Sequence, residues 1–502
     1  MSTMPVLARR YLAPALVLLV AAIALLLAYA NKARCTGPVF DAAGRSANFD
    51  VLKNQAVCYS DIQLLWLGRG IESKVFPYIH GSITPDGFLF NGTVEYPVLS
   101  GLLMWLGALP ASNDASFLLW SSIILAPFGL ATAWLLARLA GWRALLFAAA
   151  PALVMYGFHN WDLAVVLTAV AAVYIVVRCQ GWGTRKRALV AAVILAVGFC
   201  VKIYPGFFVA PLLLWALTGG DDPRRRWDVP GAAGVAGVAT LVVVAINAPF
   251  AVLGFEGWRA SFEFQSLRTA DITTNSIWYW GLRPLIGEGE TYDLIVGTAS
   301  PALALASFAA ALAAGWWILR RTGEYPWIAV SATMLCGFLL LHKVHSPQFM
   351  LWLLPFLVLL RVPWTLIGAY VLADLAIGIG VFRYFYDLGA GIDPAGGSLW
   401  VVQVGVWGRA AGLVLLAGAF LVARPAWSRS DTVTGASRYD DRALRQTGQP
   451  AGTREPRDRP RGTRRNACRE RASDTDAAAQ HRPDRGSRIR GDRAGDDPRR
   501  GT

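Results

Sequence analysis

The sequence predicts an all-α polytopic membrane protein, built as a single bundle of about twelve transmembrane helices. Apolar residues make up 55% of its 502 residues and the mean hydropathy is +0.43. Apolar runs of roughly 20 residues, the length that crosses a bilayer, recur along the chain. The formal net charge of +14 comes from Arg and Lys in short clusters between these runs and in the C-terminal tail. This pattern follows the positive-inside rule, so the charge is assigned to topology and no nucleic-acid partner is predicted.

The first apolar run extends from Tyr11 to Ala30 and is predicted to remain as an anchor, because no small-residue cleavage site follows it. Arg9 and Arg10 precede it, which predicts a cytoplasmic N-terminus and places residues 31–96 outside. Two of the six cysteines share this external loop, and they predict either a disulfide or two free thiols: Cys35 and Cys58. No cysteine pair has metal-ligand spacing, and no metal or cofactor is predicted.

A short helix is predicted inside this external loop. Ser60-x-x-Gln63 reads as a capping box, with Asp61 in the first turn that it opens. Apolar residues follow at helical spacing, namely Ile62, Leu65 and Trp66. The pattern predicts a short amphipathic helix that lies on the membrane surface.

The remaining apolar segments and the basic clusters between them set the predicted topology. If the segment at 97–110, about 14 residues long, enters the membrane without crossing it, every basic cluster falls on the cytoplasmic side. Both termini are then cytoplasmic. The segments are 97–110, 115–137, 143–158, 161–178, 188–201, 204–218, 229–252, 294–319, 326–341, 348–361, 364–385 and 398–423.

After Arg424 the composition changes. The tail has no lysine, is rich in Arg, Asp, Gly and Pro, and contains few apolar residues. Such a segment cannot bury a core. The sequence therefore predicts a transmembrane domain over residues 1–425 and a disordered Arg-rich cytoplasmic tail over 426–502.

The predicted topology gathers the polar motifs on the non-cytoplasmic side. Because an ionisable residue at membrane depth costs about 2.5 to 3.5 kcal/mol, their collection on one face predicts a common cavity. The motifs are Asp61, Glu95, His159 to Asp162, Lys202 to Pro205, the loop from about 254 to 293, and His342 to Gln348.

Five of these motifs, in this order, resemble the actinobacterial membrane glycosyltransferases of family 87. They are Cys58-Tyr-Ser-Asp-Ile, Glu95-Tyr-Pro-Val-Leu, Asn160-Trp-Asp, Lys202-Ile-Tyr-Pro and Lys343-Val-His-Ser-Pro-Gln-Phe. The resemblance covers about residues 10–425 and implies the GT-C architecture. It also implies transfer of a hexose, with mannose expected, from a polyprenyl-phosphate donor to a glycolipid or glycan acceptor. The reaction would take place on the non-cytoplasmic side of the cell membrane, among membrane lipids.

The resemblance implies that an acidic residue of the first external loop acts as the catalytic base, and Asp61 matches that position. The chemistry agrees, because a sugar hydroxyl that attacks an anomeric carbon needs a carboxylate to take its proton. The structural alternative is an acid that complements the helix macrodipole, worth about 0.3 to 1 kcal/mol.

The departing lipid phosphate needs cations, and the candidates are Lys202, Arg268, His342, Lys343 and His345. Candidates for binding the acceptor or the sugar are Glu95, Tyr96, Asn160, Asp162 and Gln348. The alternatives are helix starts for Glu95 and Asp162, snorkelling for Lys202, and interfacial anchoring for the loop at 342–348. The sequence has no glycine-rich phosphate loop and no dense carboxylate cluster, which disfavours a metal-bound nucleotide sugar.

The chief rival function is a polytopic transporter or a lipid or glycan flippase. A transporter is expected to show internal repeats with Gly- or Pro-broken spans in corresponding halves, and charges that are reached from both sides. The sequence shows no such repeat, and its polar motifs face one side. A glycosyltransferase is therefore the favoured interpretation.

Overall fold

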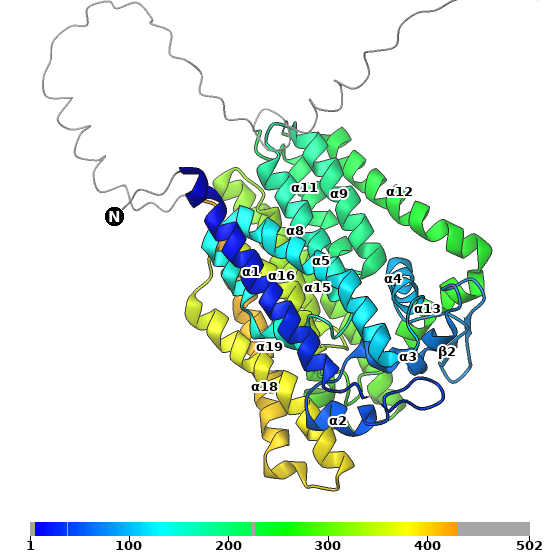
Figure 1. Cartoon of the computed structure of the whole chain (residues 1–502). Helices are drawn as coiled ribbons and strands as arrows, with labels where there is room; N and C mark the ends of the chain where they lie inside the picture. Colours follow the sequence, from blue (N-terminus) through cyan, green and yellow to red (C-terminus); the bar gives the residue numbers. More distant parts are fainter. Residues whose placement is uncertain (1–5, 38, 223–225, 429–502) are drawn as a thin grey trace, which may run out of the picture. The chain divides into compact units, whose positions relative to one another are not determined.

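The computed structural model describes residues 6–37, 39–222 and 226–428, so the predicted disordered tail lies almost wholly outside the described residues. Among the residues described, the regular structure is helical apart from one antiparallel hairpin of two short strands, β1 (Ser82–Ile83) and β2 (Leu89–Phe90). The all-α prediction is confirmed. Figure 1 shows the helices gathered into one bundle.

Six helices are long and apolar enough to cross a membrane. Several of their apolar side chains point away from the protein: Leu26 is 69% exposed on the first of them and Leu241 is 66% exposed on the third. Such surfaces suit a lipid environment. The six are α1 (Val6–Ala33), α5 (Asp114–Ala140), α12 (Val229–Leu253), α15 (Glu290–Thr322), α18 (Trp364–Gly389) and α19 (Ser398–Val422).

The other apolar segments form shorter or broken helices, so the number of crossings, about twelve, remains a prediction. α4 (Val98–Ala108) has 11 residues and is about 16 Å long at the helical rise, roughly half of a bilayer core. This length suits the half-depth helix predicted after Pro97. The remaining helices are α2 (Phe49–Gln55), α3 (Asp61–Gly68), η1 (Ile71–Ser73), η2 (Gly141–Ala144), α6 (Leu145–Ala148), α7 (Pro151–Tyr156), α8 (Asp162–Arg178), α9 (Thr184–Val201), α10 (Tyr204–Phe207), α11 (Val209–Leu217), α13 (Phe255–Leu267), η4 (Trp278–Leu282), α14 (Arg283–Ile286), α16 (Trp327–Leu341), η5 (Pro347–Phe349), α17 (Met350–Leu359) and η6 (Pro394–Gly396).

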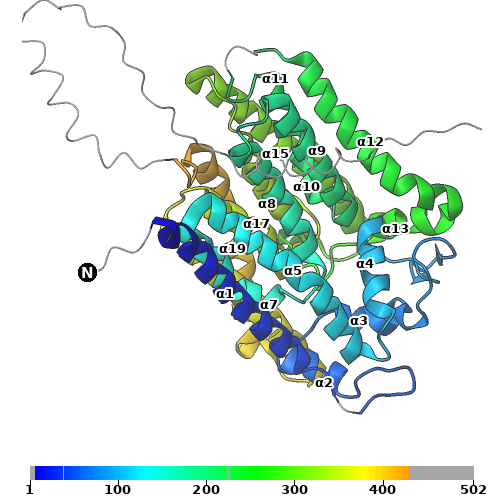
Figure 2. The ribbon, with the colours of Figure 1, turned by 45° about the horizontal axis from the view of Figure 1, so that its top comes forward.

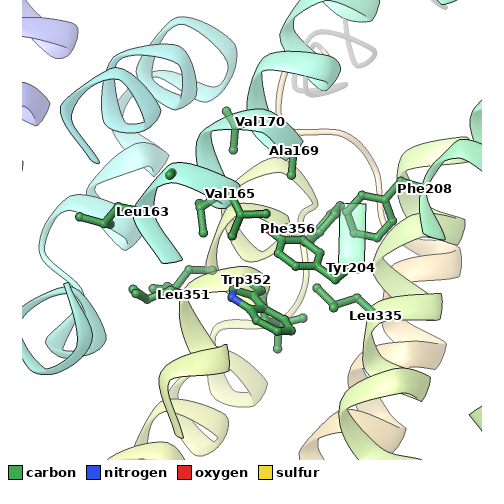
Figure 3. Packing of buried hydrophobic residues seen from close by; sticks show 14 of the residues in the cluster. Leu163, Val165, Ala169, Val170, Tyr204, Phe208, Leu335, Leu351, Trp352 and Phe356 are labelled. Atoms are coloured by element: carbon green, nitrogen blue, oxygen red, sulfur yellow. The ribbon is translucent and has the colours of Figure 1, made fainter. Parts of the chain in front are cut away.

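The centre of the bundle is formed by α8 and α17, which are buried along most of their length. α8 packs against α5, α9 and α17, and α1 packs against α5. Figures 1 and 2 both show α1 beside α5. Trp352 of α17 stacks on Tyr204 at 4.5 Å between ring centroids, in the part of the core drawn in Figure 3. This core brings the starts of α8 and α10 together.

The basic clusters and Asp162 lie at opposite ends of α8, whose first residue is Asp162 and whose last is Arg178. The two residues are therefore about 24 Å apart along the helix axis. Arg178 donates a hydrogen bond to the carbonyl of Arg138. Arg143 donates to the carbonyls of Leu357 and Leu360. The basic residues thus gather at one end of the bundle, as the predicted topology requires.

The loop after α1 folds onto the bundle through α3. The apolar residues of α3 are buried, with Ile62 0%, Leu65 4% and Trp66 2% exposed, and the helix packs against α5. The prediction of a helix with a free apolar face on the membrane surface is therefore wrong, because this face contacts protein. The capping box is also incomplete: the Ser60 side chain caps the Ile62 N–H at 3.2 Å, but among the described residues the Gln63 side chain has no hydrogen-bond partner.

Of the two alternatives for the cysteines of this loop, the structure contains the disulfide. It joins Cys35 to Cys58, and both residues are fully buried. The bond closes the segment between the end of α1 and the start of α3. It therefore ties the helix that carries Asp61 to the first long helix.

Candidate active site

Two segments that are far apart in sequence meet at Asp61. The Asp61 N–H donates to the carbonyl of His159 at 2.8 Å, and the Ser60 hydroxyl donates to the carbonyl of Phe158 at 2.8 Å. The start of α3 is thus held by backbone acceptors of the turn that precedes α8. The position of Asp61 follows from the core of the bundle, although its own residues belong to a loop.

The Asp61 carboxylate accepts two hydrogen bonds. The Tyr59 hydroxyl donates to Oδ1 at 2.7 Å, and Asn160 Nδ2 donates to Oδ2 at 2.8 Å. The side chain is 19% exposed. The carboxylate is therefore oriented by the protein and is still open to a ligand on one side.

Asn160 is the organising residue beside Asp61. It is fully buried, and its Nδ2 also donates to the Tyr96 hydroxyl at 2.7 Å. Its Oδ1 accepts from the Trp161 N–H at 2.6 Å. Both amide hydrogens are used inside the protein, so Asn160 orients Asp61 and Tyr96. Burial, followed by the nearby Asp61 charge, raises the pKa of Tyr96 well above its usual value, so its hydroxyl stays protonated.

Lys202 and Asp162 form a buried ion pair at 2.6 Å. Trp352 Nε1 donates to the same oxygen, Asp162 Oδ1, at 2.8 Å. The Lys202 ammonium also lies 5.3 Å from the ring centroid of Tyr96 and 5.6 Å from that of Trp352. Lys202 is thus enclosed by protein groups, and the second Asp162 oxygen has no hydrogen-bond partner within the described part of the chain.

Glu95 lies beside this network and is bound by Arg69, whose guanidinium donates to both of its carboxylate oxygens at 2.7 and 3.2 Å. The Glu95 carbonyl accepts from Gln265 of α13 at 2.7 Å. α4 begins only at Val98 and has no acid in its first turn. Glu95 therefore joins the external loop to α13, and the alternative of a helix-start acid does not apply.

A second cluster contains His342, Lys343 and Arg268. Lys343 donates to the carbonyl of Ser266 at 3.4 Å. Burial lowers the pKa of Lys343, and the nearby Arg268 lowers it further. Burial also lowers the pKa of His342 to about 4, so its ring is neutral at neutral pH. Its Nδ1 accepts from the Val344 N–H at 3.2 Å.

His345 and Gln348 point into the protein behind this second cluster. The backbone N–H of His345 donates to the carbonyl of Thr274 at 2.7 Å. Burial lowers the pKa of the His345 ring well below its usual value. Gln348 is 6% exposed, and in the ranges described its Oε1 has no hydrogen-bond partner. His345 is therefore a neutral anchor in this arrangement.

Most of the predicted site residues thus fall into two groups, whereas Glu95 lies beside the first group and His345 and Gln348 lie behind the second. One connected network contains Asp61, Tyr96 and Asn160, with the Asp162 and Lys202 pair reached through the Tyr96 ring. The second group contains Arg268, His342 and Lys343. Within the described ranges no hydrogen bond or ion pair joins the two groups, and no three His, Cys, Asp or Glu side chains gather closely enough to hold a metal ion.

Several residues of the network were given no role by the sequence. Tyr59 and His159 lie within the motifs that contain Asp61 and Asn160, but nothing in the sequence singled out their side chains. Trp352 looked like one more apolar residue of a span, and its indole N–H was the only hint of a polar partner. Lys32, at the end of α1, gave no signal beyond its position at the edge of an apolar run.

Fold and site together define a helical membrane protein that holds an oriented carboxylate at the end of its bundle away from the basic clusters. The family model for glycosyltransferase family 87 matches residues 95–347, just over half of the chain. The chain belongs to this family, and it is a membrane glycosyltransferase. Lys32 and Asp61 lie before the matched region.

The chain was also compared with solved structures and with curated proteins. The crystal structure of ArnT from Cupriavidus metallidurans bound to undecaprenyl phosphate aligns with 82% of this chain and 78% of that chain, at 16% identity and a TM-score of 0.38. None of the curated proteins compared matches the chain.

Proposed function

We propose that this glycosyltransferase moves a hexose, mannose by preference, from a polyprenyl-phosphate donor to a hydroxyl of a glycolipid or glycan. The reaction is placed on the non-cytoplasmic side of the cell membrane. The observation that carries the proposal is the Asp61 carboxylate, which two donors orient and which is still partly exposed. A carboxylate held in this way suits a general base.

In the proposed step, an acceptor hydroxyl loses its proton to Asp61 while its oxygen forms a bond to the anomeric carbon. The bond between that carbon and the phosphate oxygen breaks, and the polyprenyl phosphate leaves with the electron pair. Asn160 and Tyr59 hold the base during this step. Glu95, Tyr96 and Gln348 are proposed to contact the acceptor or the sugar, and Asp162 to act through Lys202.

The leaving phosphate gains negative charge on its bridging oxygen as the sugar departs, and nearby cations stabilise it. Lys343 and Arg268 are the proposed phosphate ligands of the second cluster, and Lys202 is the proposed ligand of the first. His342 is neutral in the free protein, so we propose that it donates an N–H hydrogen bond to the phosphate without adding charge. His345 is buried behind the cluster, and we propose that it supports the loop and does not contact the phosphate.

The test is a transfer assay on membranes that contain the protein, with radiolabelled polyprenyl-phosphate mannose as donor and native lipids and glycans as acceptors. Asp61→Asn keeps the shape of the side chain but cannot take a proton at neutral pH. We expect its transfer rate to fall by about 10²- to 10⁴-fold at unchanged protein level. The matched control is Asp50→Asn, which changes an exposed acid of the same loop and should leave the rate unchanged.

Two outcomes would contradict the proposal. If Asp61→Asn kept about a third of the wild-type rate at equal expression, the base would have to be sought at Glu95 or Asp162. If the wild-type protein moved the labelled lipid across the membrane and formed no labelled product, a flippase would replace the transferase. Transfer of another hexose, and not of mannose, would overturn only the choice of sugar.

A further inference from the structure

A buried lysine lies behind the proposed base and has no place in the step described above. Lys32 is at the end of α1 and is only 2% exposed. Its ammonium donates to the carbonyl of Tyr59 at 2.7 Å. Among the described residues no carboxylate lies within ion-pair distance of it, which is unusual for a buried cation.

The neighbour of Lys32 on its other side is His159, whose Nδ1 lies 3.4 Å from the ammonium nitrogen. An ammonium has no lone pair, so it donates and Nδ1 accepts. In the tautomer in which Nδ1 accepts from this ammonium, the hydrogen of the neutral imidazole is on Nε2. Burial lowers the pKa of His159 to about 3, with Lys32 as the next cause, which keeps the ring neutral.

The Nε2–H that this tautomer presents faces the proposed base. Nε2 lies 4.0 Å from Asp61 Oδ2, so the ring stands between the ammonium and the carboxylate. Aromatic side chains hold the ring in place, with centroid distances of 5.3 Å to Tyr59 and 6.3 Å to Phe382.

We infer that Lys32 is a positioning residue for the base: through His159 it fixes the tautomer that points an N–H at Asp61, and this N–H favours the ionised carboxylate. The inference rests on the proposed function of Asp61. Lys32, at the end of α1, would thus influence the charge state of the Asp61 carboxylate without contacting it. In metal-bound histidines, likewise, a hydrogen-bond partner on one ring nitrogen fixes the tautomer and the orientation of the ring.

Other groups also face this trio and contribute to its titration. Tyr59 and Tyr96 are close to Asp61, and Lys202 acts on His159. Arg34 acts on Lys32 from the exposed side of the loop. Glu95 acts on both tyrosines from further away, and Asp162 acts on Tyr96. Each variant must therefore be compared with a control that removes charge from the same region.

The central variant is Lys32→Met, which keeps the length of the side chain and removes its charge. It should fold, because an apolar side chain replaces a cation that has no ion-pair partner among the described residues. Without the cation the tautomer of His159 is no longer fixed and the carboxylate loses its N–H neighbour, so the acid limb of the kcat profile should move to higher pH by about one unit. Well below the midpoint of that limb the kcat should fall by about tenfold, and on the plateau above it the kcat should be unchanged, with both KM values within about twofold of wild type.

His159 provides the second variant pair. His159→Phe keeps the ring and removes both nitrogens, and it should move the acid limb in the same direction. Lys32→Met added to His159→Phe should then lower kcat by less than about twofold more, because Lys32 acts through the imidazole. His159→Gln, which retains an amide donor and acceptor, should recover part of the loss.

Arg34→Gln is the matched charge control. It removes a cation from the same end of α1, but this cation is exposed, and water screens its charge. In Arg34→Gln the acid limb should shift by no more than about a third of the shift seen in Lys32→Met. If Lys32→Met and His159→Phe both left the acid limb where it is in the wild type, or if their losses multiplied, the inference would be overturned.

A measurement without turnover separates this inference from the proposed function. The carboxyl band of Asp61 can be followed by infrared difference spectroscopy as the pH is changed, and it is identified by its absence in Asp61→Asn. The midpoint should rise in Lys32→Met and His159→Phe and stay in place in Arg34→Gln. If it does so in a protein that transfers no sugar, the inference stands and the proposed function fails. If the midpoint does not move in these variants and the wild-type protein transfers sugar, the proposed function stands and the inference about Lys32 fails.

Discussion

Lys202 could bind the donor phosphate or could serve only as the buried ion-pair partner of Asp162. The pair is closed at 2.6 Å, with side-chain exposures of 8% and 0%. Removal of one partner from a buried pair typically costs about 3 to 5 kcal/mol, since the other charge is left unpaired. A simple loss of activity in Lys202→Met would therefore not distinguish phosphate binding from folding.

A double variant makes the distinction. In Lys202→Met with Asp162→Asn no net charge remains buried, and the asparagine oxygen still accepts from Trp352. We expect the double variant to regain most of the thermal stability that Lys202→Met loses, and to show a donor KM raised about tenfold with an unchanged acceptor KM. Recovery of normal donor KM in the double variant would make Lys202 a structural partner only.

The sequence was informative for single residues when a chemically distinctive side chain stood at a recognisable position. Asp61 was placed correctly at the first residue of a helix, and Asn160 was expected only to share a common cavity with it. The side chains that act on Asp61 from behind were not accessible to sequence reasoning. His159 meets Lys32 across 127 residues, and this contact depends on how α1 packs against α7 and α5.

At the scale of elements, α13 supports the external loop by close backbone contact. A Cβ at Gly257 would lie 2.2 Å from the carbonyl oxygen of Tyr78. Tyr78 in turn donates from its hydroxyl to the carbonyl of Tyr96 at 2.9 Å. Because Gly257 has no side chain, the loop that contains Tyr78 can pack directly against α13, and this loop leads to Tyr96 in the candidate site.

Gly257→Ala should push this loop away from α13, because the obstructing atom is backbone and cannot rotate aside. We expect a loss of about 1 to 3 kcal/mol in the free energy of unfolding, seen as a lower Tm in detergent, together with reduced transfer. Gly237→Ala is the control, since Gly237 lies in α12 with no atom within 4 Å of its added Cβ. There the same substitution should stabilise the helix by about 0.5 to 1 kcal/mol. Equal Tm changes in the two variants would refute the close-contact argument.

The surface helix predicted from Ser60 and its neighbours illustrates what periodicity can and cannot say. The helix exists, and its N-cap is the predicted serine. Periodicity identifies an apolar face but gives no information on what covers it. α5 covers this face, and the fully buried Gln63 cannot reach back to complete the cap.

At the scale of the whole molecule, Arg409 links the last two helices to the second cluster. It is fully buried on α19 and lies 3.8 Å from Asp374 of α18. It also donates to the carbonyl of His345 at 3.0 Å and to that of Asn275 at 3.5 Å. One guanidinium thus contacts two helices and two loops, and one of these loops carries Lys343.

Arg409→Lys tests this linkage without removing charge. Lysine retains a cation for Asp374 but lacks the planar fork that reaches several acceptors at once. We expect faster hydrogen–deuterium exchange in residues 271–276 and 342–348, with a donor KM raised by several-fold. Exchange in the loop at 390–397, which Arg409 does not contact, should be unchanged. If the two loops exchanged as in the wild type, Arg409 would be a partner of Asp374 alone.

For the molecule as a whole, composition and charge pattern predicted the helical membrane class and the end of the bundle at which the basic clusters gather. Apolar length was less informative. α17 is buried at every position and α4 has only 11 residues, so an apolar run in this protein is as often a piece of core as a full span. Asp374 and Arg409 pair the two C-terminal helices inside the bundle. Their contact with the loops of the second cluster did not follow from any local pattern.

The Cys35–Cys58 disulfide has one more consequence. Lys32 stands three residues before the first cysteine and Asp61 three residues after the second, so the bond fastens the cation and the base to a single small ring. The ring forms only where thiols are oxidised, which in the proposed orientation is after the loop has left the cytoplasm. We therefore expect a newly made chain to gain its activity only once this ring has closed.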